Sequence, residues 1–562
     1  MKHALVQVWV LCAALAAAIP LAPAQTGDRA PAGPEIEIRN CNVEATLAPD
    51  THEIEAAATI TFLPREPTDY VVLSLHENLW IRKVLSAEGL ELDFEHAALG
   101  PGIVSVFFPK PLDPAREVVI RIEYKGGFDR DRFSRLYVQD ESLAFIGTEG
   151  TYLMHAAKWI PAGRFSGHKV TTRMEVTVPL GMTVIGPGTP EPVITKGISE
   201  TFVWKADVPI PAATMVAGRY FKREWAFDGF VLECFTKAED LVFPQDLARE
   251  VAGILAHYRD AYGPSASGER YRLVEVDDRL AHQHGMLGTV FFTRRELEQP
   301  ASSARPLARR IACQWWGETV GVGQAGDLWL EDGWAYYSAA GYLAKSGGED
   351  AFRAEMEALA ILALKFENTA PVRNGLDLGY RTDRYESVVA GKGAWILHML
   401  RGLLGESKFD DLARAYFREG QKGNGGMALF RPLAEERYGD SLGWYFAEWV
   451  DTTGIPSLQT DYVVYKTLDG FRVSGAVSQD RDLFRMPLEI ALAGKGEKTL
   501  AEIELSGRST LFDIVAFSKP ESVVLDPNHR LLQNSTGLQA SVHLALGNDR
   551  KDQGDFVGAI QS

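Results

Sequence analysis

The chain has 562 residues, enough for several domains of roughly 150 residues each. Hydrophobic residues make up 46% of it and charged residues 24%, a globular balance that excludes a disordered or fibrous chain. The formal net charge of -17 opposes binding to a nucleic acid or an anionic membrane surface, and no long basic run offsets it. The sequence therefore predicts no nucleic-acid partner.

Residues 1–24 have the pattern of a secretory signal peptide. Lys2 and His3 precede an apolar run from Ala4 to Ala18, and Ala22-Pro23-Ala24 forms a small-residue cleavage site before Gln25. No later stretch of the sequence has the ~20 apolar residues that a membrane-spanning helix needs. We expect a periplasmic or secreted protein without a membrane span.

Three cysteines follow this leader: Cys41, Cys234 and Cys313. Their odd number and wide spacing do not indicate a disulfide framework, although one pair could form. We expect the stability to come from the hydrophobic core.

Residues 35–220 contain short runs of alternating polar and apolar residues, bounded by Pro, Gly or Asp. Many strands at this spacing predict an antiparallel β domain, a sandwich or a saddle. The expected strands are Asn42–Leu47, Ile54–Leu63, Val71–Leu75, Ile103–Phe108, Val118–Tyr124, Thr171–Val178 and Thr201–Lys205.

Residues 221–455 change to a period near 3.6, which indicates a mostly helical region with one extended piece at Arg272–Val276. The expected helices are Gln245–Tyr262, Ala351–Glu367, Gly391–Leu404, Phe409–Arg418, Ala428–Tyr438 and Leu442–Val450.

Alternation returns in residues 456–535, which predicts a small C-terminal β-sandwich. The tail, residues 536–562, faintly resembles the first helix of a tetratricopeptide repeat, but half a repeat cannot bury its own face.

The stretch from Leu307 to Tyr337, LARRIACQWWGETVGVGQAGDLWLEDGWAYY, contains the frame of a peptidase active site. Metal-dependent peptide hydrolysis uses two His one helical turn apart, a Glu beside the first, and a carboxylate from the next helix. Residues 313–317 (CQWWG) and 328–335 (LWLEDGWA) resemble H-Q-W-F-G and L-W-L-N-E-G-F-A of the membrane alanyl aminopeptidase family of zinc metallopeptidases, the gluzincins.

The resemblance extends from about Glu35 to Asn534. It implies an α+β multidomain fold with an N-terminal antiparallel β domain, a mostly helical thermolysin-like middle domain and a small C-terminal β-sandwich. The further matching segments are Trp159-Ile160-Pro161, Thr171–Pro179, Met215–Gly218, Lys392–Leu400 and Trp449–Leu458.

The same resemblance places unsuitable residues at the catalytic positions. The first ligand His falls on Arg309, the general-base Glu on Arg310, and the second His on Cys313. The third ligand, a Glu in the family, falls on Asp332 after the same eighteen intervening residues. Arginine acts neither as a metal ligand nor as a base, because it keeps its proton.

Two more family positions are altered. The oxyanion-stabilising Tyr falls on Ala390, while Tyr385 keeps the place of a Tyr five residues upstream. The segment G-A-M-E-N of active members reads His284-Gly285-Met286-Leu287-Gly288, so the Glu that grips the substrate's amine falls on Leu287, in a register that can slip by one residue.

A metal site is therefore not expected, because one Cys and one Asp are fewer ligands than the three that catalytic zinc sites use. The alternative is that His282 and His284, on one face of an extended segment, add imidazoles from across the cleft. We expect instead that Arg309 or Arg310 pairs with Asp332 in place of the metal. Arginine heads reaching into an open cleft are the other possibility.

Other candidates receive structural interpretations. Cys313 beside arginines could be a nucleophile, but nothing in the sequence places a His base, so a buried inert thiol is favoured. Glu318 and Glu331 are interpreted as solvated or capping charges. The aromatic pairs Trp315-Trp316 and Tyr336-Tyr337 are interpreted as core.

The resulting hypothesis is an exported aminopeptidase-like protein that is not an enzyme and has no cofactor, with a cleft that binds a peptide or a partner protein. The expected substrate-binding residues are His284, Gly285, Met286, Gln314 and Tyr385. The alternative is an active zinc aminopeptidase, or another hydrolase, using an unusual site on the same fold.

Overall fold

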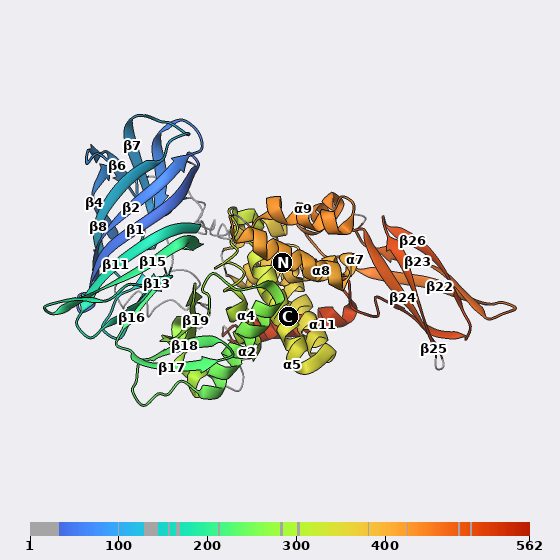
Figure 1. Ribbon diagram of the computed structural model, residues 1–562. Helices are drawn as coiled ribbons and strands as arrows, with labels where there is room; N and C mark the ends of the chain where they lie inside the picture. The colour runs from blue at the N-terminus through green and yellow to red at the C-terminus, as the bar shows by residue number, and fades with distance from the viewer. Residues whose placement is uncertain are drawn as a thin grey trace, which may run out of the picture.

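The computed structural model describes residues 33–98, 100–128, 144–154, 158–163, 169–211, 214–280, 285–299, 304–379, 381–423, 425–481, 484–494, 497–552 and 554–561. In Figure 1 the chain runs from a large N-terminal sheet, through a helical middle region, to a β-sandwich at the opposite end. The expected α+β architecture is confirmed. The signal peptide lies outside the described residues.

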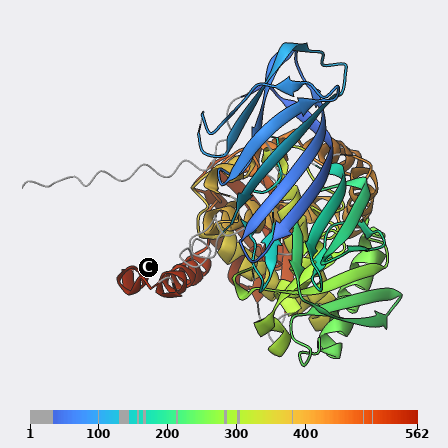
Figure 2. The ribbon, with the colours of Figure 1, turned by 90° about the vertical axis from the view of Figure 1, so that its left-hand side faces the viewer.

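The N-terminal region is dominated by one nine-stranded sheet, seen face-on in Figure 2. Apolar and polar residues alternate along its strands, so that one face packs into the core. In spatial order the strands are β13 (Thr189–Pro190), β15 (Ser199–Pro211), β11 (Lys169–Pro179), β1 (Ile36–Ala48), β2 (Glu53–Pro64), β8 (Val118–Gly127), β4 (Leu79–Ser86) and β5 (Glu91–Leu92), with β14 (Ile194–Lys196) also paired to β15.

One pairing in this sheet departs from the expected antiparallel pattern. β1 runs antiparallel to β2, with Val43 opposite Ala58, but parallel to β11, with Val43 opposite Met174. The connection between β1 and β11 is long, so the chain can return to the same end of the sheet before β11 begins. Local alternation predicts both strands but does not show this direction.

Two smaller sheets accompany the large one. The first has the order β3 (Thr68–Ser74), β7 (Ile103–Leu112), β6 (Phe94–His96). The second has the order β12 (Thr183–Ile185), β16 (Met215–Gly218), β10 (Thr151–Leu153), β9 (Ala144–Phe145).

The middle region begins with a five-stranded sheet, which the sequence predicted only at β19. Its order is β17 (Phe221–Phe227), β18 (Phe230–Thr236), β19 (Arg270–Val276), β21 (Thr289–Thr293), β20 (Gly285–Met286). The helix α2 (Gln245–Tyr262) has the predicted bounds and buries its apolar stripe beside this sheet.

The remaining helices of the middle region include the predicted ones and add the short helices α3 and α6, which the periodicity did not predict. They are α3 (Arg294–Glu298), α4 (Ala304–Ala312), α5 (Trp329–Leu364), α6 (Asp383–Tyr385), α7 (Lys392–Leu404), α8 (Glu406–Gly420), α9 (Met427–Tyr438) and α10 (Gly443–Trp449), with a π-helical segment at Glu386–Gly391. The helix α5 is longer than expected because its two halves continue across a break at Gly348, where φ is 74°.

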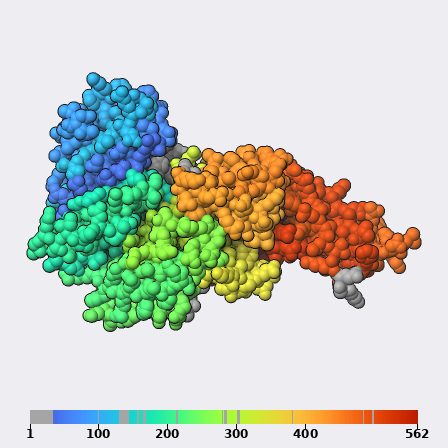
Figure 3. Space-filling model, viewed as in Figure 1, coloured from blue at the N-terminus to red at the C-terminus, as the bar shows by residue number. Residues whose placement is uncertain are grey.

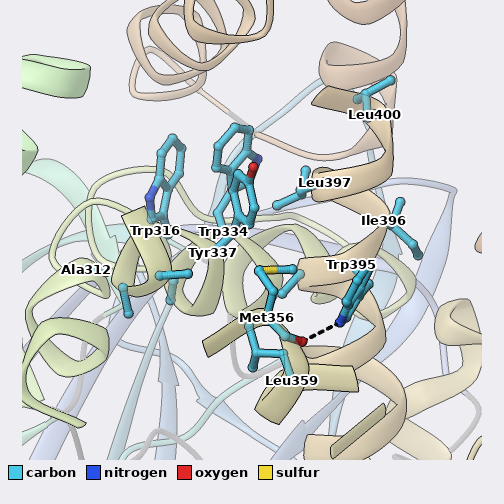
Figure 4. Packing of buried hydrophobic residues seen from close by; sticks show 14 of the residues in the cluster. Ala312, Trp316, Trp334, Tyr337, Met356, Leu359, Trp395, Ile396, Leu397 and Leu400 are labelled. Carbon is cyan, nitrogen blue, oxygen red and sulfur yellow. Dashed lines mark hydrogen bonds between the residues drawn. The ribbon is translucent and has the colours of Figure 1, made fainter. Parts of the chain in front are cut away.

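The aromatic core of the middle region fixes α4 and α5 relative to each other (Figure 4). The Trp316 ring stacks on Trp334 with centroids 4.8 Å apart, and its Nε1 donates to Ser338 Oγ at 2.9 Å. Trp395 on α7 donates to the carbonyl of Met356 at 3.1 Å. Because these side chains are large and buried, the segments that carry the site residues are held tightly.

The C-terminal β-sandwich has two three-stranded sheets and forms the protruding end of the molecule in Figure 3. Its core contains Val473, Val477, Ile490 and Phe512. The sheets are β22 (Leu458–Lys466), β23 (Phe471–Gln479), β26 (Ser509–Ala516), and β25 (Glu497–Leu505), β24 (Met486–Gly494), β27 (Pro520–Leu525). The predicted sandwich is confirmed.

The tail forms α11 (Thr536–Asp552) and α12 (Phe556–Gln561). Lys365 of α5 pairs with Asp549 of α11 at 2.5 Å, so the tail is attached to the middle region. The predicted domain boundaries near residues 220, 455 and 535 fall between elements, and the division into domains stays a prediction. Among the described residues, each helix is too short or too polar to cross a lipid bilayer.

Candidate functional site

The predicted site residues come from three segments that the core brings together. The helix α4 carries Arg309 and Arg310 near its C-terminal end, and the first turn of α5 carries Asp332. The short helix α6 and the π-helical segment after it carry Tyr385 and Glu386. The two principal helices of the motif, α4 and α5, are thus in contact, as the resemblance implies.

Asp332 is buried, and its partners are not the predicted ones. Tyr385 donates its hydroxyl to Asp332 Oδ2 at 2.7 Å, and Arg381 Nη2 lies 3.9 Å from Oδ1. Burial raises the pKa of Asp332, and the charge of Arg381 opposes that shift. Within the described chain neither Arg309 nor Arg310 forms an ion pair with Asp332, so the predicted partner is wrong. The guanidinium that pairs with Asp332 belongs to Arg381.

Arg309 lies in the same cluster but contacts the other carboxylate. Its Nη1 donates to the Tyr336 hydroxyl at 2.6 Å and to Glu386 Oε2 at 3.5 Å, and its guanidinium lies 4.6 Å from the Tyr336 ring centroid. Tyr336 in turn donates to Glu386. Arg381 Nη1 lies 4.0 Å from Glu386 Oε1. We call Arg309, Arg381, Asp332 and Glu386 the charge cluster.

Arg310 points away from this cluster, because consecutive residues on a helix lie about 100° apart. Its Nη2 donates to Glu296 Oε1 at 2.5 Å, and its Nη1 donates to the Phe291 carbonyl at 2.6 Å. The side chain is 8% exposed. Arg310 therefore ties α4 to β21 and α3.

Cys313 is buried, and its thiol is protonated. Burial raises its pKa from 9.0 to about 12 and outweighs the nearby charges of Arg381 and Arg309, which lower it. This agrees with an inert thiol, because the thiolate is the reactive form. Cys41 and Cys234 are also buried free thiols.

We expect the native mature chain to react with a thiol reagent such as DTNB on the order of 100-fold more slowly than the chain unfolded in guanidinium. All three thiols are buried, so none offers a fast thiolate. Stopped-flow absorbance measures the two rates. A fast native phase that Cys313→Ala removes would contradict an inert Cys313.

Gln314 connects α4 to the segment that the resemblance aligns with the substrate-binding loop. Its Oε1 accepts from Gly288 N at 2.8 Å, and its Nε2 donates to the carbonyls of Met286 and Thr289 at 3.1 and 3.2 Å. Met286 and Leu287 are also buried. His282 and His284 lie outside the described residues.

Gly285 has a φ of 131°, and a Cβ there would come within 2.0 Å of the Thr289 carbonyl. A side chain there would clash with the facing strand, so glycine allows β20 to pair closely with β21. Ala390, at the position of the oxyanion Tyr, is fully buried in the π-helical segment and offers no polar group.

Two carboxyls were misinterpreted from the sequence as solvated. Glu318 is buried, and Glu331 is partly buried and accepts from Val322 N at 2.6 Å. Lys169 of β11 reaches them from the N-terminal sheet, and its Nζ donates to the Glu318 carbonyl at 2.8 Å. Burial raises the pKa of Glu318 to about 8 and that of Glu331 to about 7, and lowers that of Lys169 to about 8.

Sequence reasoning also missed Arg381, Glu386 and Tyr336 as members of the site. Tyr336 was interpreted as core, but its hydroxyl bridges Arg309 and Glu386. Arg381 has a left-handed backbone, with φ of 60°, which is rare for arginine. The only local signal was the nearness of Glu386 to Tyr385, which the motif already placed near the site.

The described residues offer few ligands for a catalytic zinc ion. No group of three His, Cys, Asp or Glu side chains among them is placed to hold a metal. Asp332 accepts a hydrogen bond from Tyr385 and lies 3.9 Å from Arg381. Two guanidinium groups beside these atoms would repel a divalent cation.

The fold, with the paired helices α4 and α5, is similar to that of proteins described as M1 zinc metallopeptidases. Residues 294–449 match the Peptidase family M1 domain, which supports a relationship to the M1 gluzincin aminopeptidases. In Streptomyces lividans, aminopeptidase N is 26% identical over 208 residues, 35% of this chain and 23% of that protein.

Two further curated relatives match longer stretches of the chain at lower identity. The probable M1 family aminopeptidase 2 of Encephalitozoon cuniculi is 22% identical over 321 residues, 53% of this chain and 37% of that protein. The probable aminopeptidase 1 of Sulfurisphaera tokodaii is 22% identical over 411 residues, 68% of this chain and 51% of that protein. The chain thus spans between about a quarter and half of the length of these relatives.

Solved structures share the fold. The M1 zinc metallopeptidase from Deinococcus radiodurans superposes with a TM-score of 0.60 at 19% identity, covering 76% of this chain and 95% of that one. A mutant of a two-domain M1 zinc metallopeptidase bound to L-tryptophan gives the same TM-score of 0.60 and identity of 19%, covering 76% of this chain and 96% of that one. At this identity the likeness concerns the fold alone.

Proposed function

We propose that this chain is an exported, non-catalytic relative of the M1 aminopeptidases, whose cleft binds a peptide or a partner protein without a metal. The observation that carries the proposal is the charge cluster. Arg309 and Arg381 lie beside Asp332 and Glu386, so two fixed positive charges stand among the carboxylates at the motif. The leader-like residues 1–24 support export.

The chemistry of the cluster supports the absence of hydrolysis. A metallopeptidase needs a metal-bound water and a base that takes its proton. Arginine at both of the corresponding helix positions supplies neither, since its guanidinium stays protonated. Cys313 is protonated at neutral pH and so is a poor ligand and a poor nucleophile.

The retained frame supports binding. The backbone around the aligned loop is held by Gln314 through three hydrogen bonds, and Tyr385 is held by Asp332. One fold neighbour, the mutant two-domain M1 zinc metallopeptidase, is bound to the amino acid L-tryptophan. A rigid frame without the catalytic groups can still bind a peptide, because binding and chemistry use different atoms.

The alternative function is an active metallo-aminopeptidase with an unusual site. The likeness to proteins described as M1 zinc metallopeptidases favours it, and His282 and His284 would supply the missing ligands. Under this alternative the two His would have to bind the metal beside two guanidinium groups.

Purified protein is expected to contain no stoichiometric zinc and to release no product from aminoacyl amides at a rate above background. Plasma mass spectrometry of the metal content and a fluorogenic turnover assay on the same sample measure both. The matched control is the triple variant Arg309→His, Cys313→His and Asp332→Glu, which restores three ligands at motif spacing and is expected to gain zinc. Stoichiometric zinc with turnover in the unmodified protein would establish the alternative.

A further inference from the structure

The ion pairs of the charge cluster are longer than two other ion pairs that arginines of α4 form. Arg309 lies 3.5 Å from Glu386, and Arg381 lies 3.9 Å from Asp332 and 4.0 Å from Glu386. By contrast, Arg305 and Arg310 of α4 make contacts of 2.7 and 2.5 Å with Glu355 and Glu296. Charge-assisted hydrogen bonds are normally about 2.7 to 2.9 Å long. The cluster is therefore balanced in charge but loosely paired.

Arg309 also keeps donors that no described residue uses. A guanidinium has five N–H donors, and in the described part of the chain only Nη1 of Arg309 makes hydrogen bonds. Its side chain is 27% exposed, whereas that of Arg310 is 8% exposed. The Arg309 side chain is thus the more exposed of the two and keeps unused donors in a site that is otherwise mostly enclosed.

The carboxylates of the cluster are more fully engaged. Asp332 Oδ2 accepts from Tyr385, and Glu386 Oε2 accepts from Tyr336 and Arg309. The side chain of Asp332 is 10% exposed and that of Glu386 19% exposed. A cationic group entering the site would be repelled by two guanidinium groups, while an anionic group would meet the unused donors of Arg309.

We infer that the charge cluster is a receptor for a carboxylate of the peptide or protein ligand, held on the free edge of the Arg309 guanidinium. This inference rests on the proposed function and specifies the chemistry that the cleft recognises. The planar fork of arginine matches the geometry of a carboxylate, which can accept two parallel N–H bonds. Glu386 competes with the ligand for Arg309, so the ligand carboxylate weakens the long Arg309–Glu386 pair.

Calorimetric titration with blocked dipeptides tests this inference. The probe is N-acetyl-Ala-Phe with a free C-terminal carboxylate, and the matched probe is the same peptide as its C-terminal amide. The acid is expected to bind about tenfold or more tightly than the amide, because hydrogen bonds to charged groups are the stronger ones. N-acetyl-Ala-Asp-amide distinguishes a side-chain carboxylate from a C-terminal one, and binding of either acid supports the receptor.

Two variants give opposite expected results. Arg309→Gln is expected to abolish the preference for the acid, and Glu386→Gln is expected to strengthen it, because the competing carboxylate is removed while an oxygen remains for Tyr336. The control Arg384→Gln changes the net charge equally from an exposed position of the same segment and is expected to leave the preference unchanged.

The outcomes separate the inference from the proposed function. Equal affinity for the acids and the amide would overturn the carboxylate receptor and leave peptide binding standing. Absence of binding by all three peptides would overturn both. If Arg309→Gln fails to fold, the direction of the Glu386→Gln effect still decides, and a weaker preference there would overturn the inference.

Discussion

Replacing Arg310 by methionine is expected to lower the free energy of unfolding by about 3 to 5 kcal/mol. The guanidinium pairs with Glu296 at 2.5 Å and also donates to the Phe291 carbonyl, and the side chain is 8% exposed. Removing it leaves the partly enclosed Glu296 carboxylate without its counter-charge. The free-energy cost of such an unpaired charge exceeds the net stabilisation that the ion pair provides. Urea unfolding monitored by tryptophan fluorescence measures the change.

The control for Arg310→Met is Arg294→Gln in α3. Arg294 pairs with Glu298 at 2.8 Å, but both side chains are about half exposed, so the expected change is about 0.5 kcal/mol or less. Adding Glu296→Gln to Arg310→Met is expected to recover part of the loss, because the stranded charge is gone. A loss near that of Arg294→Gln would show that Arg310 contributes little to the fold.

This result would bear on the proposed absence of peptidase chemistry at the motif. The resemblance aligns Arg310 with a general-base Glu, yet the side chain points away from the charge cluster and joins α4 to β21 and α3. A residue with that structural role is not available to activate a water. The neighbouring Arg309 lies in the charge cluster, so the two adjacent arginines have different surroundings.

Periodicity predicted most of the fold. The apolar stripe of α2 gave its bounds, and the alternating strands of the C-terminal sandwich were found in sequence order. Residue patterns within one element depend on local geometry, so a sequence shows them directly. The parallel pairing of β1 with β11 depends on where a long connection returns, and no local pattern records it.

The candidate site was predicted less completely, for a similar reason. The motif located Arg309, Cys313 and Asp332 on facing helices, but it could not choose the partner of Asp332. That partner, Arg381, comes from another segment and adopts a left-handed backbone that its sequence neighbours do not require. Ion pairs follow tertiary proximity, which helical spacing does not determine.

The surroundings of Glu318 and Glu331, at the contact with the N-terminal sheet, could not be predicted from the sequence for the same reason. Both were interpreted from the sequence as solvated or capping charges. Their cationic partner is Lys169, on a strand that precedes them by more than a hundred residues. A Cβ on Gly321 would come within 2.6 Å of the Lys169 Cε, so the lysine is closely enclosed as well.

The protein is expected to lose stability as the pH rises from about 4.5 through about 7, and Glu331→Gln is expected to remove much of that loss. Burial raises the pKa of Glu331 in the folded chain from 4.5 to about 7, so the folded state prefers the protonated carboxyl. The stability that Glu331 contributes is therefore fully present below pH 4.5 and is lost as the pH rises through the pKa of the folded state. The raised pKa of Glu318 acts in the same direction.

The rise of the Glu331 pKa from 4.5 to about 7 corresponds to a loss of stability on the order of 2 to 3 kcal/mol at pH 8. The lowered pKa of Lys169 has the opposite sign, but it acts mainly between its folded value of about 8 and its ordinary value of 10.5, above the window of Glu331. Urea unfolding at a series of pH values from 5 to 8 separates the two contributions. The control Glu349→Gln replaces an exposed carboxyl of α5, whose side chain is 87% exposed, and is expected to follow the unmodified protein.

If Glu331→Gln keeps the same pH dependence as Glu349→Gln, the carboxyl is solvated in the folded protein, as its sequence context indicated. If it flattens the dependence, Glu331 is enclosed at the contact between β11 and the loop that precedes α5. Because Lys169 donates to backbone carbonyls of that loop, the ionisation of Glu331 would then affect the attachment of the N-terminal sheet to the segment leading into Asp332. The charge cluster and the sheet would be connected through this one carboxyl.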